Sequence, residues 1–158
     1  MAANYTAINE QTIAATQPVI FTETRVPCNR GLVFHKDGTG GFLVASMMHG
    51  NCGCRCNPQQ YETQYYVEFN GNIAIPTGGT VEEIQIALAS DGETEPASIM
   101  RLTPAAVEEY GSVSTGIIIS VPSICGCESV SVRNVSTQGI LVQNASIVFD
   151  LVGVRRVR

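Results

Sequence analysis

Several residue types are scarce in this chain of 158 residues. It has no tryptophan, a single lysine (Lys36) and only 15% charged residues, against about 25% in an average globular domain. The net charge of −5 argues against nucleic-acid binding, which needs a basic face to displace the cations around the phosphates. No apolar run approaches the roughly 18 residues of a membrane-spanning helix, so no membrane partner is expected. The first residues lack the basic and apolar segments of a secretory signal, so we expect synthesis in the cytoplasm.

Catalytic patterns are scarce as well. Neither His35 nor His49 stands in a recognised nucleophile signature. The adjacent carboxylates Glu82 and Glu83 would point to opposite faces of a strand. The glycine-rich segment 38–41 lacks the lysine spacing of a phosphate-binding loop. We therefore expect a protein that is not an enzyme and that needs no cofactor.

Alternation of apolar and polar residues dominates the chain from about residue 18 onward. Tyr65, Val67 and Phe69 would share one face of a strand, with the intervening residues on the other. Short turn signals rich in glycine, proline and asparagine separate these runs. The pattern predicts an all-β antiparallel sandwich of about 8–10 strands. In the run 113–121, Ile118 faces away from the aliphatic stripe and is a candidate for a contact between subunits.

Two segments depart from this pattern. Thr103 can cap a helix, Pro104 fits its first position and Gly111 fits the position that ends it. A short helical turn is therefore expected near 104–110. Residues 1–17 are polar and weakly patterned, and we expect an N-terminal arm or an edge segment there. Residues 18–158 would then form one β-sandwich domain.

The cysteines gather in two expected loops. Both loops carry Cys-Gly-Cys, and the thiols that they bring together are Cys52, Cys54, Cys56, Cys125 and Cys127. Disulfides are the preferred interpretation, within the chain or between chains, with Cys28 as the natural sixth partner. A zinc site formed by these five thiols is the second interpretation, although its pairs are more closely spaced than usual. Free thiols are the third.

The end of the chain carries a cluster of positive charge. Arg155, Arg156 and Arg158 hold three of the nine cationic side chains. A solvated end that discourages edge pairing is the preferred interpretation, and a docking contact is the other. The three arginines are therefore docking candidates.

Three segments of the second half carry a resemblance to a known family. Segments 114–121 (STGIIISV), 130–134 (VSVRN) and 142–149 (VQNASIVF) resemble the C1q/TNF-like jelly rolls of bacterial and phage surface proteins. Segments 73–80 and 103–110 look like those of small proteins from phages and prophages of gut bacteria. The family's Gly-Asp is replaced here by residues 125–128 (CGCE). The resemblance implies a trimeric, non-enzymatic jelly-roll β-sandwich displayed on a surface.

The resemblance also implies a function. We expect a virion structural protein, a capsid decoration or head-fibre subunit of a tailed phage, made in the host cytoplasm and located on the virion surface. Its partners would be its own copies in a homotrimer and the major capsid or other virion proteins. One alternative is a spore or cell-surface appendage subunit cross-linked through the cysteines. Another is a fibre-tip module that binds carbohydrate or a receptor, with host-surface glycans as partners.

Overall fold

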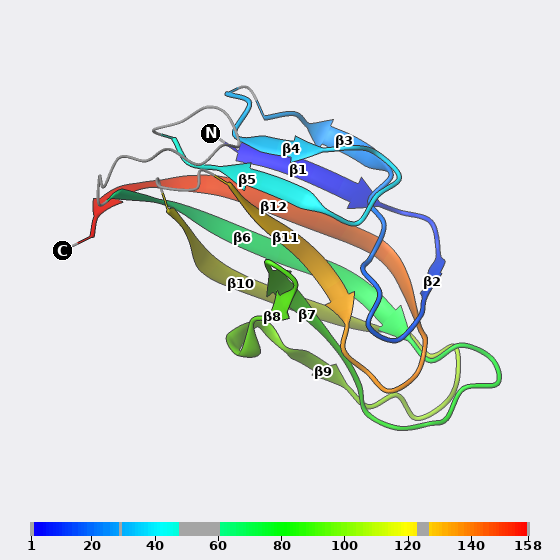
Figure 1. Cartoon of the computed structure of the whole chain (residues 1–158). Helices are drawn as coiled ribbons and strands as arrows, with labels where there is room; N and C mark the ends of the chain where they lie inside the picture. Colours follow the sequence, from blue (N-terminus) through cyan, green and yellow to red (C-terminus); the bar gives the residue numbers. More distant parts are fainter. Residues whose placement is uncertain (1, 29, 48–60, 123–126, 158) are drawn as a thin grey trace.

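The computed structural model describes residues 2–28, 30–47, 61–122 and 127–157. These residues form two antiparallel sheets of six strands each, which lie face to face as the two layers of a sandwich (Figure 1). The prediction of an all-β antiparallel jelly-roll sandwich is confirmed. The described part of the chain has twelve strands rather than 8–10, because several of them are short pairings at the margins of the sheets.

Sheet A contains the longest strands of the molecule. Its order is β10-β6-β12-β1-β3, and β2 pairs with β12 beyond this path. Its strands are β1 (Ala2–Ala7), β2 (Gln11–Ile13), β3 (Glu23–Val26), β6 (Tyr61–Ala74), β10 (Gly111–Pro122) and β12 (Ile140–Arg156).

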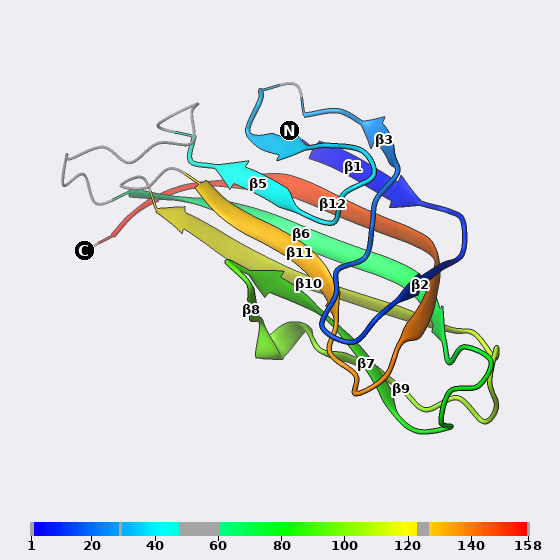
Figure 2. The same ribbon diagram turned by 45° about the vertical axis from the view of Figure 1, so that its right-hand side comes forward.

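Sheet B covers one face of sheet A and leaves the opposite face of sheet A uncovered (Figure 2). Its order is β4-β5-β11-β7-β8, and β9 pairs with β7. Its strands are β4 (Val33–His35), β5 (Phe42–Ala45), β7 (Ile84–Ser90), β8 (Glu93–Thr94), β9 (Met100–Leu102) and β11 (Cys127–Asn134).

The core lies between the two sheets, where the inward-facing residues of each strand meet. Strand β6 shows the rule: Tyr65, Val67 and Phe69 are fully buried, while Tyr66 and Asn70 are exposed. Alternation of this kind places every second side chain on the same face of a strand. An aromatic group fills the centre of the core, with Tyr5, Phe21, Phe42 and Phe149 in edge or tilted contacts.

The helical turn expected near 104–110 is not there. Residues 103–110 form bends and a turn, and the single 3-10 turn of the described residues is η1 (Pro96–Ser98). The backbone N–H of Glu108 donates to the carbonyl oxygen of Ile75 at 2.7 Å instead of to its own segment. Glu108 also has a φ of 60°, which a right-handed helix does not accommodate. A contact with another segment therefore overrides the local helix signals.

The first residues of the chain are part of sheet A, with β1 inside the sheet and the short β2 paired with β12. Strand β1 lies between β12 and β3 in sheet A, and Ala3, Tyr5 and Ala7 are buried in the core. The alternation was present in the sequence. Alanine contributes so little apolar surface that the polar residues between these positions concealed it.

No helix among the described residues is long and apolar enough to cross a membrane.

Candidate functional site

The outer face of sheet A is the surface that we consider first. It is the side of sheet A that sheet B does not cover. Cross-strand neighbours on β10, β6 and β12 align there in rows. Three successive rows are Ile118–Tyr66–Asp150, Gly116–Glu68–Val148 and Ser114–Asn70–Ser146.

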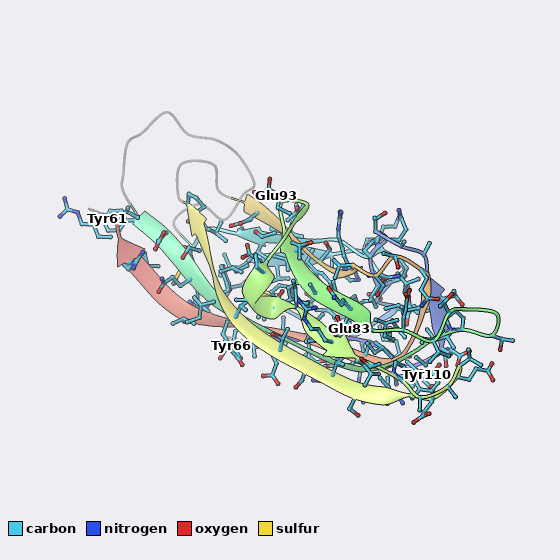
Figure 3. All side chains as sticks on the ribbon, turned by 90° about the horizontal axis from the view of Figure 1, so that it is seen from below. Tyr61, Tyr66, Glu83, Glu93 and Tyr110 are labelled. Carbon is cyan, nitrogen blue, oxygen red and sulfur yellow. The ribbon has the colours of Figure 1, made fainter. Side chains whose placement is uncertain are left out.

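Its apolar part centres on Ile118 and Tyr66. Ile118 is 59% exposed and Tyr66 38% exposed, and the two residues are direct cross-strand partners. A Cβ atom at Gly116 would collide with the hydroxyl end of Tyr66, so the glycine lets this ring lie against the sheet. Figure 3 shows Tyr66 on one side of the molecule and Glu93 on the other. The expectation that Ile118 faces away from the core stripe is confirmed.

Most of the other side chains on this face are small and uncharged. Asn4 and Thr6 of β1 continue the rows beyond β12, opposite Val148 and Ser146, and Asn4 Nδ2 donates to Ser146 Oγ at 3.3 Å. Within the three rows, Glu68 and Asp150 are the charged members. Contact with another surface through these rows would bury the apolar pair Ile118 and Tyr66 and would have to desolvate or pair the two carboxylates.

A polar pocket of about 330 Å³ opens at one end of the same face. Its polar side chains are neutral amides and hydroxyls: Asn70, Asn72, Asn144, Ser112 and Ser114. Asn144 has a φ of 52°, and the β12–β6 register shifts beside it. These side chains come from three strands distant in the sequence, and the sequence analysis did not find the pocket.

Most of the cysteine cluster lies outside the described residues, namely Cys52, Cys54, Cys56 and Cys125. Cys127 begins β11 and takes part in a disulfide. Cys28 is half-buried, and its Sγ accepts a hydrogen bond from the Leu32 N–H at 3.3 Å. Within the described ranges, no group of three or more potential ligand side chains could hold a metal ion. The choice between disulfides and zinc for the whole cluster stays a prediction.

The docking candidates at the end of the chain lie on strand β12 as far as it is described. Arg155 is held against Glu62 of β6 by an Nη2–Oε1 contact of 2.6 Å and an Nε–Oε1 hydrogen bond of 2.7 Å. Arg156 pairs with Tyr61 in the ladder, and Arg158 lies outside the described residues. Arg155 is therefore engaged within the chain, whereas docking through the other two stays a prediction.

Glu128 is the carboxylate with the most unusual surroundings. It is half-buried, and the hydroxyl of Ser90 donates to its Oε1, while its Oε2 is buried with no partner among the described residues. Burial raises the pKa of Glu128, and the nearby carboxylates of Asp91 and Glu95 raise it further, against the Ser90 hydrogen bond, which lowers it. Burial disfavours the charged form of a carboxyl group.

Histidine provides no available base in the described part of the chain. The ring of His35 stacks on Phe42, with 4.2 Å between ring centroids. Its two nitrogens lie 3.0 Å from the carbonyl oxygen of Gly41 and 3.2 Å from that of Phe21. His35 thus joins backbone segments, and His49 lies outside the described residues.

Comparisons with solved structures agree with this architecture. The globular domain of zebrafish complement 1qA protein is similar over 99% of this chain and 98% of its own, with 15% identity and a TM-score of 0.63. Rabbit GITRL is similar over 96% of this chain and 93% of its own, with 12% identity and a TM-score of 0.46. A family 35 carbohydrate-binding module from Clostridium thermocellum is similar over 93% of this chain and 97% of its own, with 12% identity and a TM-score of 0.36. No protein-family model and no curated protein matches the sequence.

The fold assignment depends on the zebrafish domain, whose TM-score is well above those of the other two. The chain has the jelly-roll β-sandwich fold of this C1q globular domain. At 15% identity the likeness extends to the fold alone, because one fold hosts many unrelated functions.

Proposed function

We propose that this protein is a non-enzymatic virion structural protein, a capsid decoration or head-fibre subunit of a tailed phage that assembles as a homotrimer. The outer face of sheet A is the contact between copies in this proposal. The sequence resemblance to phage surface proteins supports the virion role, and the C1q/TNF-like fold supports the trimer.

The observation that carries the proposal is the exposed cross-strand pair Ile118 and Tyr66 on the outer face of sheet A. An exposed isoleucine beside an exposed tyrosine costs free energy in water, and burial against a second copy recovers it. Closed cyclic symmetry is the usual outcome of association between identical chains. Gly116 keeps the Tyr66 ring close to the sheet, so another subunit can approach closely.

The oligomeric state tests the contact. Static light scattering on the full chain should give three times the chain mass, and Ile118→Asp should shift it to the mass of one chain. Leu43→Asp is the matched control, because Leu43 is 46% exposed on β5 of sheet B and should leave the trimer intact. A wild-type monomer at micromolar concentration contradicts the proposal, as does equal dissociation by both variants.

The virion role needs a separate test. Genes for capsid and portal proteins beside the encoding gene, and the chain itself in purified particles, are the expected results. Sporulation genes in that position, with the chain in spore coats, would instead favour the cross-linked appendage.

One observation favours a second candidate, a module that binds a neutral glycan. Amide and hydroxyl groups line the pocket between Asn70 and Asn144, and such groups hydrogen-bond sugar hydroxyls. The pocket belongs to the same face as the proposed contact, so a trimer formed through that face would restrict its access. Binding of neutral monosaccharides by a monomeric wild-type chain would favour this candidate over the trimer.

A further inference from the structure

A second pocket, of about 270 Å³, opens near β8 and the end of β11 in sheet B. Its lining includes Thr16, Gly92, Thr94, Arg133 and Ser136, and it contains no acidic side chain. Because it belongs to the other sheet, it does not depend on the proposed contact through the outer face of sheet A.

Arg133 is the charged group of this pocket. It is half-buried and lies opposite Ala87 in the β11–β7 ladder. Its Nε donates to Ser131 Oγ at 3.2 Å, which uses one of the five N–H groups of a guanidinium. Among the described residues, no carboxylate forms an ion pair with it.

Other arginines of the chain behave differently. Arg101 contacts Glu83 at 2.8 Å and Arg155 contacts Glu62 at 2.6 Å, although both guanidinium side chains are largely exposed. Among the described residues, Arg101 and Arg155 are thus paired although water could solvate them, whereas the half-buried Arg133, like the exposed Arg30 and Arg156, forms no ion pair with a carboxylate. Partial burial of an unpaired charge is unfavourable, so an anion from outside the chain is the group that this position lacks.

The rim of the pocket supplies further donors. The hydroxyls of Thr16 and Thr94 make no hydrogen bond with another described residue, whereas the Ser136 hydroxyl is already engaged with the backbone of Gln85. Thr16 has a φ of 69°, which is a strained conformation for a β-branched residue. The backbone N–H of Thr16 donates to the carbonyl oxygen of Asn134 at 2.9 Å, and this bond holds the strained residue beside the arginine. Strain of this kind is characteristic of functional sites.

The acidic residues beside the pocket are Asp91, Glu93 and Glu95, which flank the lining residues Gly92 and Thr94. Among the described residues, none of their carboxylates forms an ion pair with Arg133. The carboxylates of Asp91 and Glu95 raise the pKa of Glu128. Glu128 lies near the start of β11, whereas Arg133 lies near its end. Glu128 itself lies five positions from Arg133 along the strand, which corresponds to roughly 16 Å.

We infer that this pocket is an anion-binding site in which Arg133 holds a carboxylate, and that its ligand is a carboxylate-bearing molecule about the size of one sugar ring. A guanidinium binds a carboxylate through two parallel hydrogen bonds, and the Thr16 and Thr94 hydroxyls would bond the hydroxyls of the ring. At about 270 Å³ the pocket lies just below the usual range for ligand sites, roughly 300–1,000 Å³. A free inorganic oxyanion offers the same chemistry to the arginine, and the test separates the two sources.

Isothermal titration calorimetry on the full chain at constant ionic strength tests the site with sodium glucuronate, glucose and sodium sulfate as probes. We expect glucuronate to bind and glucose not to bind. Arg133→Gln should weaken glucuronate binding by about tenfold or more, since hydrogen bonds to charged groups are the stronger ones. Arg133→Lys should weaken it less, because lysine keeps the charge and loses the planar fork.

Arg101→Gln is the matched control, with the same change in charge on an exposed arginine of the same sheet. It should leave glucuronate binding within about twofold of wild type, a margin well below the loss expected for a charged hydrogen bond. Sulfate binding that Arg133→Gln abolishes, without glucuronate binding, would support the anion site and assign it to an inorganic ion. No binding of either anion, or equal losses in the Arg133 and Arg101 variants, would overturn the site. Light scattering of Arg133→Gln should match wild type, so a failure here is distinct from a failure of the trimer.

Discussion

The hydroxyl of Tyr65 donates a hydrogen bond of 2.6 Å to the backbone carbonyl oxygen of Ala45. Both residues are fully buried, and the bond joins β6 of sheet A to β5 of sheet B across the core. Burial raises the pKa of Tyr65 well above its usual value, so the hydroxyl keeps its proton and acts as a donor. The two layers are therefore linked by a specific polar contact in addition to apolar packing.

Tyr65→Phe should lower the free energy of unfolding by about 1–3 kcal/mol, because the buried carbonyl oxygen of Ala45 loses this donor. Tyr61→Phe is the control: it makes the same change at the start of the same strand, where the hydroxyl forms no hydrogen bond with another described residue. It should change stability by less than about 0.5 kcal/mol. Urea denaturation of both variants measures the difference, and equal stabilities would show that the Tyr65 hydroxyl contributes nothing.

The contrast between Tyr65 and Tyr66 shows what the sequence predicts well. Alternation reflects the half-buried state of a strand, so it identified the inward face of β6 and the outward position of Ile118. The signals at Thr103 and Pro104 were equally regular, yet they are local. The backbone bond from Glu108 to Ile75 comes from tertiary structure, which overrides weak helix propensity in so short a segment.

The pockets could not be predicted for a related reason. Thr16, Thr94 and Arg133 come from three separate parts of the chain, and the pairing of β11 with β7 and the backbone bond from Thr16 to Asn134 bring them together. Nothing in the sequence around Arg133 indicates that it forms no ion pair with a carboxylate in the part of the chain that the structure describes. Sequence patterns predict which face a side chain occupies, whereas the partners on that face depend on topology.

Two adjacent glycines, Gly40 and Gly41, lie in the segment that connects β4 to β5 and test how it packs against Pro18 and Val19. A Cβ atom at Gly40 would lie 2.7 Å from Pro18 Cβ and 2.9 Å from the carbonyl oxygen of Val19, whereas a Cβ atom at Gly41 would meet nothing within 4 Å. Gly40→Ala should therefore destabilise the fold by about 1–3 kcal/mol, the usual cost of overpacking, and Gly41→Ala should be nearly neutral. Thermal unfolding monitored by circular dichroism compares them, and equal melting temperatures would contradict the predicted clash.

Glu128 should make the stability of the protein depend on pH. Its pKa is raised above the value of 4.5 by burial, so the folded state favours the protonated form. The stabilisation that Glu128 contributes is fully present below the pKa that this group has in the unfolded chain. It is lost as the pH rises through the higher pKa of the folded state. Glu128→Gln, which stays neutral, should therefore raise the melting temperature at pH 7 relative to wild type and give little gain at pH 4.

Glu93→Gln is the control for this pH dependence. It removes the same charge from an exposed residue of β8 and should leave the difference in melting temperature between pH 4 and pH 7 as it is in wild type. If the two variants changed this difference equally, the effect would come from net charge, and the assignment to Glu128 would be wrong.

The cysteines allow a prediction that separates covalent bonds from metal. Cys127 takes part in a disulfide at the start of β11, and a disulfide contributes about 2–4 kcal/mol by restricting the unfolded chain. Reductant should therefore lower the melting temperature, whereas a chelator at neutral pH should leave it unchanged. Fewer than the six thiols of the sequence should react in unfolded protein before reduction, and all six after it. A zinc site would give the opposite pattern, because a chelator removes the metal and all thiols are then reactive. If a chelator lowered the melting temperature and all six thiols reacted before reduction, the cysteines would form a metal centre and the disulfide interpretation would be wrong.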